Sequence, residues 1–373
     1  MTRLLLLDGN SLAYRAFFAL PTDLATASGQ VTNAVFGFTS MLVNLLRDHQ
    51  PDGIAVAFDR PEPNFRHAVA DDYKAGRAEA PDILRQQMGL VRQVLEVLAI
   101  PMVDLAGYEA DDVIATLATR ARDRGDEVIV VTGDRDCYQL VEDPLVRVLY
   151  NRRGVSDYVL YDEAGIRERT GVTPAQYPQY AALRGDPSDN LPGVPGVGEK
   201  TAAKLINDYG DLDGIFANLD KLTPKLRQNL AGHEARVRLN AELTPLVRDA
   251  PVDADLDSLR MGDWSRDEAR QLFNFLEFRT LWDRLVEAVG EGSQATAPMP
   301  CVSAEVQASA DADEAVRLLA KLGADGRTLA LDAAWEGQPG RSPLTGLALA
   351  DAEVEAEAVA EGRVSLPAHW IGA

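Results

Sequence analysis

Short apolar runs alternate with helical patterns through the N-terminal part of the chain. The runs Arg3–Leu7, Gly53–Phe58 and Glu127–Val131 are almost wholly apolar, as expected of parallel strands that are buried on both faces. Between them, apolar residues recur at spacings of three and four over Asn33–Leu46 and Pro81–Leu98, which predicts helical crossovers. Strands that alternate with helices predict an α/β fold built on a parallel sheet.

The pattern changes toward the C-terminus. Leu145–Tyr150 and Tyr158–Tyr161 predict a further pair of strands, whereas Leu212–Leu246 and Asp267–Val289 have helical spacing and predict a mostly helical subdomain. In the last of these helices we expect a set of aromatic side chains in the core. The set comprises Phe273, Phe275, Phe278 and Trp282.

Residues 291–313 are rich in Ala, Ser, Gly, Pro and acidic residues and have no periodicity, which predicts a linker. Beyond it, Ala315–Leu322 predicts a helix, and Thr328–Leu331 and Leu344–Ala350 predict strands of a second unit. This unit is short for an independent domain.

Charge and cysteine content narrow the class of protein. The net charge of −21 argues against a nucleic-acid partner, but 13 acidic and five basic residues lie from residue 291 onward, so −8 belongs to the C-terminal part. The two cysteines predict neither a disulfide framework nor a zinc site. Since no apolar run approaches the ~18 residues of a membrane span, we expect a cytoplasmic protein.

Carboxylates follow each of the three apolar runs. Others open the predicted helix that begins at Glu109, and two more lie in the turn of residues 184–190. Because the carboxyl ends of parallel strands meet at one edge of a sheet, we expect these side chains to share a site there. Each also has a local alternative, as a turn cap or as an acid in a first helical turn. The candidate set comprises Asp8, Asp59, Glu109, Asp111, Asp112, Asp134, Asp136, Asp186 and Asp189.

So many carboxylates at one edge would repel one another unless cations neutralised them. Oxygen ligands favour Mg²⁺ or Mn²⁺ over zinc, and two such ions ~4 Å apart can activate water against a phosphodiester. The four histidines form no pattern with a nucleophilic Ser or Cys. A phosphoaspartate phosphatase is disfavoured because Asn10 stands where such an enzyme has a second Asp.

Basic residues occur in two further segments. Arg60–Arg77 is polar and irregular; it is either a solvated loop or a basic cover whose Arg66, Lys74 and Arg77 reach an anionic substrate. The run from Gly193 to Lys204 is not a P-loop, because Glu199 separates Gly198 from Lys200. It favours a helix–hairpin–helix that approaches a phosphate backbone closely.

These motifs, in this order, resemble the 5′-nuclease domain of bacterial DNA polymerases I, a family that includes the flap endonucleases. The resemblance covers about residues 1–290. It is carried by Asp8-Gly9-Asn10-Ser11, Tyr14-Arg15-Ala16, Phe58-Asp59, Tyr73-Lys74-Ala75-Gly76-Arg77, Glu109-Ala110-Asp111-Asp112-Val113-Ile114, Thr132-Gly133-Asp134-Arg135-Asp136, Gly185-Asp186-Pro187-Ser188-Asp189-Asn190 and the run Gly193–Thr201.

The resemblance implies a PIN-like catalytic core over residues 1–178, with a helical arch at about 60–98, and a helix–hairpin–helix subdomain over 179–290. It implies one metal at Asp8, Asp59, Glu109 and Asp111, with Asp112 beside them, and a second at Asp134, Asp136, Asp186 and Asp189. It implies that Lys74 and Arg77 steer the scissile phosphate. Implied DNA contacts are Arg15, Arg66, Gly193, Val194, Gly196, Val197, Gly198, Lys200, Thr201 and Lys204, and the hairpin is implied as a K⁺ site.

The implied function is a monomeric, metal-dependent nuclease that removes DNA flaps and RNA primers. After the linker, the strand with Asp332 resembles the start of a 3′–5′ exonuclease domain, but Ala334 replaces the glutamate of its metal pair. We therefore expect residues 314–373 to be an inactive, truncated segment, and we expect no DNA synthesis. The alternatives are a catalytically inactive DNA-binding scaffold and a PIN-type ribonuclease.

Overall fold

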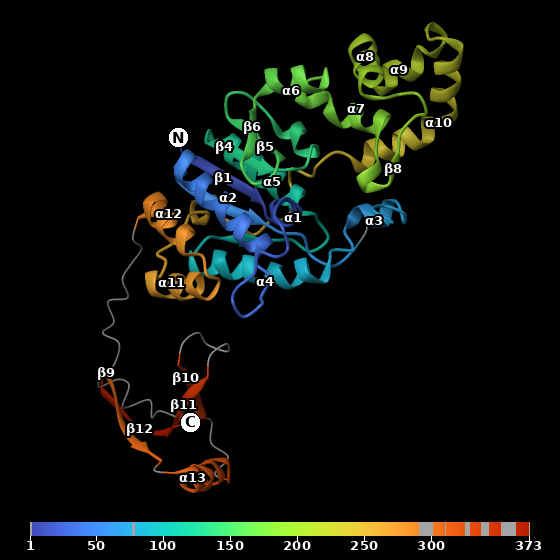
Figure 1. The fold of residues 1–373 in the computed structure, drawn as a ribbon. Helices are drawn as coiled ribbons and strands as arrows, with labels where there is room; N and C mark the ends of the chain where they lie inside the picture. The colour runs from blue at the N-terminus through green and yellow to red at the C-terminus, as the bar shows by residue number, and fades with distance from the viewer. Residues whose placement is uncertain are drawn as a thin grey trace. The chain divides into compact units, whose positions relative to one another are not determined.

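The structure is a computed structural model that describes residues 2–76, 79–290, 301–309, 311–324, 329–336, 343–351 and 363–372. The chain divides into two compact units, Met1–Gln294 and Ala295–Ala373 (Figure 1). Within the described ranges, no helix combines the length and apolar character that crossing a bilayer requires.

The first unit is built on a six-stranded sheet with the order β3-β2-β1-β4-β5-β6. Neighbouring strands are parallel except for β5 and β6, which form an antiparallel hairpin. The predicted strands are confirmed, and β3 is an addition too short to show a period. The strands are β1 (Arg3–Asp8), β2 (Gly53–Ala57), β3 (Met102–Val103), β4 (Glu127–Thr132), β5 (Val146–Arg153) and β6 (Asp157–Tyr161).

Alternate leucines of β1 face opposite sides of the sheet. Leu4 and Leu6 join a core with the helix α5 (Ala110–Arg124), whereas Leu5 and Leu7 join a second core. Each fully buried leucine stabilises the fold by about 1.5–3 kcal/mol relative to an exposed one. The second core contains residues of α1 (Gly9–Ala19), α2 (Asn33–His49) and α4 (Asp82–Val97).

Two C-terminal helices of the first unit belong to the sheet core rather than to the helical subdomain. In α11 (Arg266–Phe275) and α12 (Arg279–Val289), Phe273 and Leu281 are buried in the same cluster as Phe38 of α2. The expected boundary of 179–290 for the helical subdomain is therefore wrong at its C-terminal side. Phe275, which was expected in the core, is 60% exposed.

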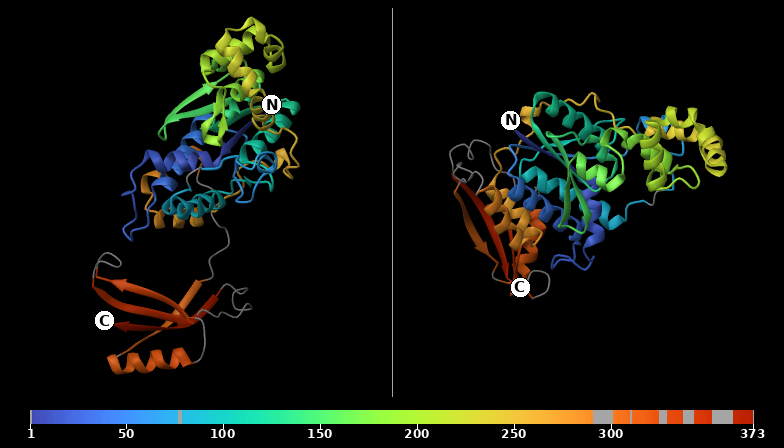
Figure 2. Two further views of the ribbon diagram at one scale, coloured as in Figure 1. Left: turned by 90° about the vertical axis from the view of Figure 1, so that its right-hand side faces the viewer. Right: turned by 90° about the horizontal axis from the view of Figure 1, so that it is seen from above.

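In the helical subdomain, the predicted turn of residues 193–198 lies between two helices. After α7 come the two short antiparallel strands β7 and β8, and the turn then leads from β8 into α8. In Figures 1 and 2 the subdomain helices, green to yellow, gather beside one end of the sheet. The helix α6 (Glu163–Thr170) precedes the subdomain. The elements of the subdomain are α7 (Tyr177–Arg184), β7 (Gly185–Asp186), β8 (Leu191–Pro192), α8 (Glu199–Tyr209), α9 (Leu212–Ala217) and α10 (Pro224–Leu243), and α3 (Phe65–Val69) lies in the arch segment.

The second unit is a four-stranded sheet with the order β10-β11-β12-β9, in which only the β12–β9 pair is parallel. Its elements are β9 (Cys301–Ala308), α13 (Ala312–Ala324), β10 (Leu329–Trp335), β11 (Leu344–Asp351) and β12 (Arg363–Gly372). The strand β9 lies inside the expected linker of residues 291–313, so that prediction is wrong for 301–308. Residues 291–300 lie outside the described ranges.

Candidate active site

The acidic residues gather where the strand order reverses. From β1 the chain moves outward through β2 to β3, and then returns to place β4 on the other side of β1. The carboxyl ends of β1, β2 and β4 therefore meet at a topological switch point, which is where open α/β sheets bind ligands. Asp8 ends β1, Asp59 follows β2, and Asp134 follows β4.

Asp8 is held in place from two sides. The Ser11 amide donates to Oδ1 at 2.9 Å, and the Thr132 hydroxyl donates to Oδ2 at 2.8 Å. The next residue is Gly9, where a Cβ atom would lie 2.5 Å from the ring of Phe58, so a larger residue would disturb this turn. Burial, and then repulsion from Asp59, raises the pKa of Asp8 from 3.8 to about 7.

The N-terminus of α5 supplies two more carboxylates and orients a third. The Ala110 amide donates to Asp59 Oδ1 at 2.8 Å. Burial and the charge of Asp8 raise the pKa of Asp111 well above its usual value. Burial would also raise the pKa of Glu109, but Lys74 and Arg66 outweigh it and hold that pKa below its usual value.

A second group of acids continues from β4 to the helical subdomain. The Asp136 amide donates to Asp134 Oδ1 at 2.9 Å. Burial, and then the charge of Asp134, raises the pKa of Asp136. Asp189 accepts from the Tyr73 hydroxyl at 2.9 Å, and Asp186 caps the short helix that contains Asp189. Burial raises the pKa of Asp189 as well.

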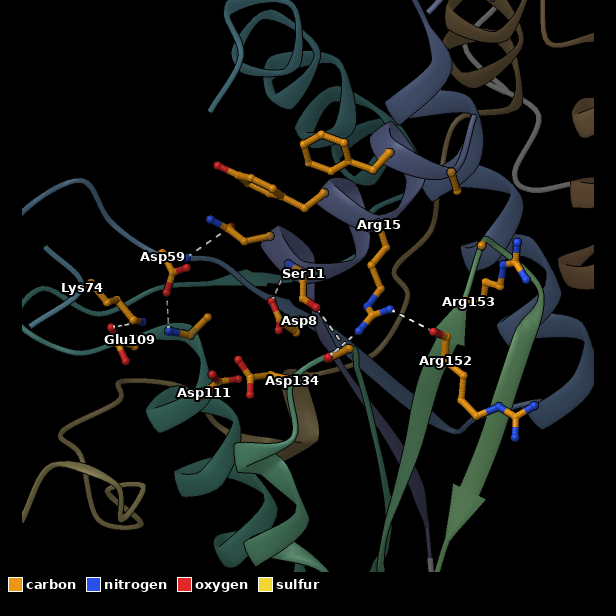
Figure 3. A pocket seen from close by; sticks show the side chains of 17 residues that line it. Asp8, Ser11, Arg15, Asp59, Lys74, Glu109, Asp111, Asp134, Arg152 and Arg153 are labelled. Carbon is orange, nitrogen blue, oxygen red and sulfur yellow. Dashed lines mark hydrogen bonds and ion pairs between the residues drawn. The ribbon is translucent and has the colours of Figure 1, made fainter. Parts of the chain in front are cut away.

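Asp8, Asp59, Glu109 and Asp111 form the first group of acids, which faces a cavity of about 720 Å³, shown in Figure 3. Lys74 stands at the acidic end, where its Nζ lies 2.5 Å from Glu109 Oε1. Across the cavity, Arg15 donates to the carbonyl of Gly133 at 2.6 Å, beside Arg152 and Arg153. The carboxylates that line the cavity are Asp8, Asp59, Glu109, Asp111 and Asp134.

The predicted ligands Asp136, Asp186 and Asp189 lie outside the lining of this cavity. Two other residues of the predicted site pair with each other instead. Asp112 is fully buried and forms a two-pronged ion pair with the guanidinium of Arg66, which is 1% exposed. Neither side chain lines the cavity. The predictions of Asp112 as a metal ligand and of Arg66 as a phosphate contact are therefore wrong for this structure. The local alternative holds for Asp112, because it accepts from the Glu109 amide at 3.1 Å.

The predicted DNA contacts have mixed surroundings. Lys200 and Lys204 are exposed on α8, and Lys204 pairs with Asp208 at 2.7 Å. Val194 and Val197 are buried in the core, so only their backbone can face a ligand. The remaining glycines and Thr201 of the predicted set lie in the turn before α8 and in its first turn, namely Gly193, Gly196, Gly198 and Thr201. Arg77 lies outside the described residues.

The carboxylates are suitable ligands for divalent cations, but their side chains do not converge on one point in this structure. Over the described ranges, no three His, Cys, Asp or Glu side chains converge tightly enough to hold an ion as they stand. The buried Oδ1 of Asp136 nevertheless has no hydrogen-bond donor, and the pKa values of Asp8 and Asp111 are raised by burial and then by repulsion from neighbouring carboxylates. Both features indicate missing positive charge, so the residues present fit oxygen-ligated metal ions.

Several residues at the site were not predicted as members of it. Thr132 orients Asp8, and Tyr73 donates to both Glu109, at 3.2 Å, and Asp189. Arg152 and Arg153 reach the cavity from the end of β5. The adjacent arginine pair before Gly154 was a visible signal, but the contacts of Thr132 and Tyr73 depend on partners far away in the chain.

Two family models match consecutive parts of the first unit. The 5′-3′ exonuclease N-terminal resolvase-like domain matches residues 3–171, and the 5′-3′ exonuclease C-terminal SAM fold matches residues 172–267. The chain belongs to the 5′-3′ exonuclease family. The predictions of a nuclease and of its α/β core with a helical subdomain are thereby confirmed.

Relatives of this 5′-3′ exonuclease chain include bacterial DNA polymerases I. This chain is 52% identical to the DNA polymerase I of Mycobacterium leprae over 292 residues, which are 78% of this chain and 32% of the relative. It is 47% identical to that of Mycobacterium tuberculosis over 354 residues, which are 94% of this chain and 39% of the relative. The chain thus spans less than half of the length of these polymerases.

Solved structures support the same fold. The bacteriophage T5 D15 flap endonuclease, crystallised with DNA and metal ions, has a TM-score of 0.55 at 20% identity and covers 77% of this chain and 99% of its own. The catalytic core of Rad2 with a DNA substrate has a TM-score of 0.52 at 16% identity, covering 77% and 92%.

Proposed function

We propose that this chain is a metal-dependent, structure-specific 5′ nuclease that hydrolyses phosphodiester bonds of DNA. It would act both as a 5′–3′ exonuclease and as a flap endonuclease, removing flaps and RNA primers during replication and repair. The observation that carries the proposal is the cavity of Figure 3, in which five carboxylates face Lys74 and three arginines. Cleavage of a nucleic-acid strand needs both features. Carboxylates hold the metal ions that assist hydrolysis, and basic side chains hold the negatively charged strand.

The proposal assigns one ion to Asp8, Asp59, Glu109 and Asp111, and a second ion to Asp134, Asp136, Asp186 and Asp189. Mg²⁺ or Mn²⁺ suits these oxygen ligands. When bound, the ions would neutralise the carboxylates, activate a water and stabilise the leaving oxygen.

The chain's own cations would bind and orient the strand. Lys74 reaches over the acids from the arch segment, where it would steer the scissile phosphate toward them. Arg15, Arg152 and Arg153 would hold the neighbouring part of the strand at the opposite end of the cavity. Guanidinium groups suit this task because their forked donors match phosphate oxygens.

The helical subdomain would hold the duplex. No side chain caps α8, whose N-cap is Gly198, so the first amides of the helix can point toward a phosphate. Lys200 and Lys204 add positive charge along this helix. The proposal extends to a K⁺ ion held by backbone carbonyls of the turn at residues 193–198.

The second unit would not proofread. Asp332 lies on β10, paired opposite Ala348, but the side chain two residues further on is that of Ala334. A carboxylate pair for a metal ion is therefore absent from this described strand. We expect no removal of a mismatched 3′ end by the purified chain.

The test of the proposed function is cleavage of a 5′-labelled flap duplex by the purified chain, with Mg²⁺ and with EDTA. A single strand of the same sequence serves as the control substrate. Mg²⁺-dependent cutting at the junction, with little cutting of the single strand, is the expected result. Flap binding without cutting would replace the proposal with a DNA-binding scaffold, and a preference for unstructured RNA would indicate a ribonuclease.

A further inference from the structure

Arg66 of α3 has no hydrogen-bond donor left for a ligand. Its guanidinium has five N–H groups, and the structure gives five contacts. Nε donates to the Leu243 carbonyl at 2.8 Å. Nη1 donates to Asp112 Oδ2 at 2.6 Å and to Glu109 Oε2 at 3.3 Å. Nη2 donates to Asp112 Oδ1 at 2.8 Å and to the Pro245 carbonyl at 3.2 Å.

Asp112 is equally saturated. A carboxylate offers about four lone-pair sites, and four donors reach it. Oδ1 accepts from Arg66 and from the Val247 amide, the latter at 2.9 Å. Oδ2 accepts from Arg66 and from the Glu109 amide. With no exposed surface and every acceptor site in use, Asp112 has nothing left with which to coordinate a metal ion.

We propose that Arg66 and Asp112 are a buried positioning pair, which fixes Glu109 relative to both the arch segment and the helical subdomain. The inference rests on the proposed function, because Glu109 is there a metal ligand. Arg66 contacts the Glu109 side chain and Asp112 contacts its backbone, so the pair holds this residue at two points. The same guanidinium is tied to the end of α10 through Leu243 and to the following loop through Pro245.

The attachment continues along one face of α5. Asp112, Thr116 and Arg120 are spaced by four residues and therefore share a face of the helix. Thr116 exchanges hydrogen bonds with Val247 and Ala250, both at 3.1 Å. Arg120 donates to the carbonyl of Ala250 at 3.1 Å and to that of Val252 at 2.8 Å. The chain that leaves α10 is thus fastened to the helix that carries Glu109 and Asp111.

The first experiment separates a positioning residue from a metal ligand by counting bound Mn²⁺ in calorimetric titrations. Asp112→Asn keeps the size of the side chain, and Asp134→Asn is the matched control in the site. We expect Asp112→Asn to bind as many Mn²⁺ ions as the wild type, with dissociation constants within about threefold. Asp134→Asn should lose an ion or weaken it at least tenfold. Loss of an ion in Asp112→Asn would overturn the proposal.

The second experiment separates a positioning residue from a phosphate contact. Binding of a flap duplex is measured in Ca²⁺ at several salt concentrations, since each neutralised phosphate adds about 0.9 to the slope of log K against log salt. Arg66→Lys should keep the wild-type slope, because the buried guanidinium meets no phosphate. Lys200→Ala, an exposed control, should reduce the slope by about one. A shallower slope for Arg66→Lys would overturn the proposal.

The third experiment tests whether the two residues act as one unit. Asp112→Asn and Arg66→Lys should each lower kcat about tenfold or more with little change in KM, and the double variant should be no slower than the slower single variant. Effects that multiply would overturn the pairing, and failure of both single variants to fold would reduce the pair to a purely structural role. If the wild type does not cut flaps, the proposed function fails, whereas the metal count and the salt slope still decide the roles of Arg66 and Asp112.

Discussion

The ammonium group of Lys74 lies 2.5 Å from Oε1 of Glu109, so a basic residue of the arch segment rests directly on a carboxylate of the candidate active site. The backbone of Lys74 is left-handed, with φ of 56°, and its amide donates to the carbonyl of Asp189 at 3.0 Å. Lys74 therefore contacts both acidic groups, one through its side chain and the other through its backbone.

Removal of this ammonium group should affect turnover more than binding. We expect Lys74→Ala to lower kcat roughly 100-fold, because a preorganised cation acts mostly on charge that develops in the transition state. The dissociation constant for the flap should change less than tenfold. Single-turnover rates and binding in Ca²⁺ measure the two quantities.

The control for this variant is Arg47→Ala, on the exposed end of α2, where Arg47 pairs with Asp48. An exposed pair of this kind contributes little to stability, so this variant should cut like the wild type. Equal losses of turnover and binding in Lys74→Ala would make Lys74 an ordinary binding residue.

Asp134 stands between the two acidic groups, since its charge acts on Asp8 and Asp111 as well as on Asp136. We expect Asp134→Ala to abolish flap cleavage while flap binding stays within about threefold of the wild type. Circular dichroism and thermal melting check the fold. An unfolded variant would show that this acid is structural rather than chemical.

Tyr73 links the two groups through its hydroxyl, which donates to Glu109 and to Asp189. Tyr73→Phe keeps the buried ring and removes only these bonds. We expect a fall in kcat of about tenfold and a loss of roughly 1.5–3 kcal/mol of stability, the usual range for hydrogen bonds to charged groups. Unchanged kcat with the expected loss of stability would limit Tyr73 to a structural role.

Without metal ions, the site should make stability fall as pH rises. The carboxyls of Asp8, Asp111, Asp136 and Asp189 have raised pKa values in the folded chain. The folded state then binds more protons than the unfolded state between the usual pKa, near 3.8, and the folded value, about 7 for Asp8. Stability decreases with pH across that interval, because unfolding releases the protons that the folded chain still holds, and rising pH favours that release.

In EDTA we therefore expect Tm to be higher near pH 5 than near pH 8, by roughly 5 °C. Mg²⁺ should raise Tm at pH 8 more than at pH 5. Calorimetry of the wild type and of Asp8→Asn measures both effects, and the variant should depend less on pH. A Tm in EDTA that rises from pH 5 to pH 8 would contradict the raised pKa values.

The strand-end acids could be predicted from sequence because the geometry of parallel strands is general. Once Asp8, Asp59 and Asp134 follow buried strands, they share an edge whatever the side chains around them. The same argument fails within the first turn of α5. Asp111 and Asp112 are adjacent in sequence but point about 100° apart around the helix. Only the structure shows which of them faces the cavity.

The other errors have a similar cause, which is pairing over long distances in the chain. Arg66 is surrounded by partners from residues 109–112 and 243–245, which no local pattern reveals. The strand β9 has the composition of a linker but pairs with β12, about 60 residues further on. The helices α11 and α12 have ordinary amphipathic patterns, which do not specify that they return to the sheet.

The hydrogen bonds between α5 and residues 247–252 fix the distance between two sites of the first unit. One site is the turn before α8, and the other is the edge of the sheet with its acidic residues. Under the proposed function, a duplex bound at the turn would place its strand at a set distance from the acidic residues. That distance would then determine at which nucleotide the strand is cut, independently of the base sequence.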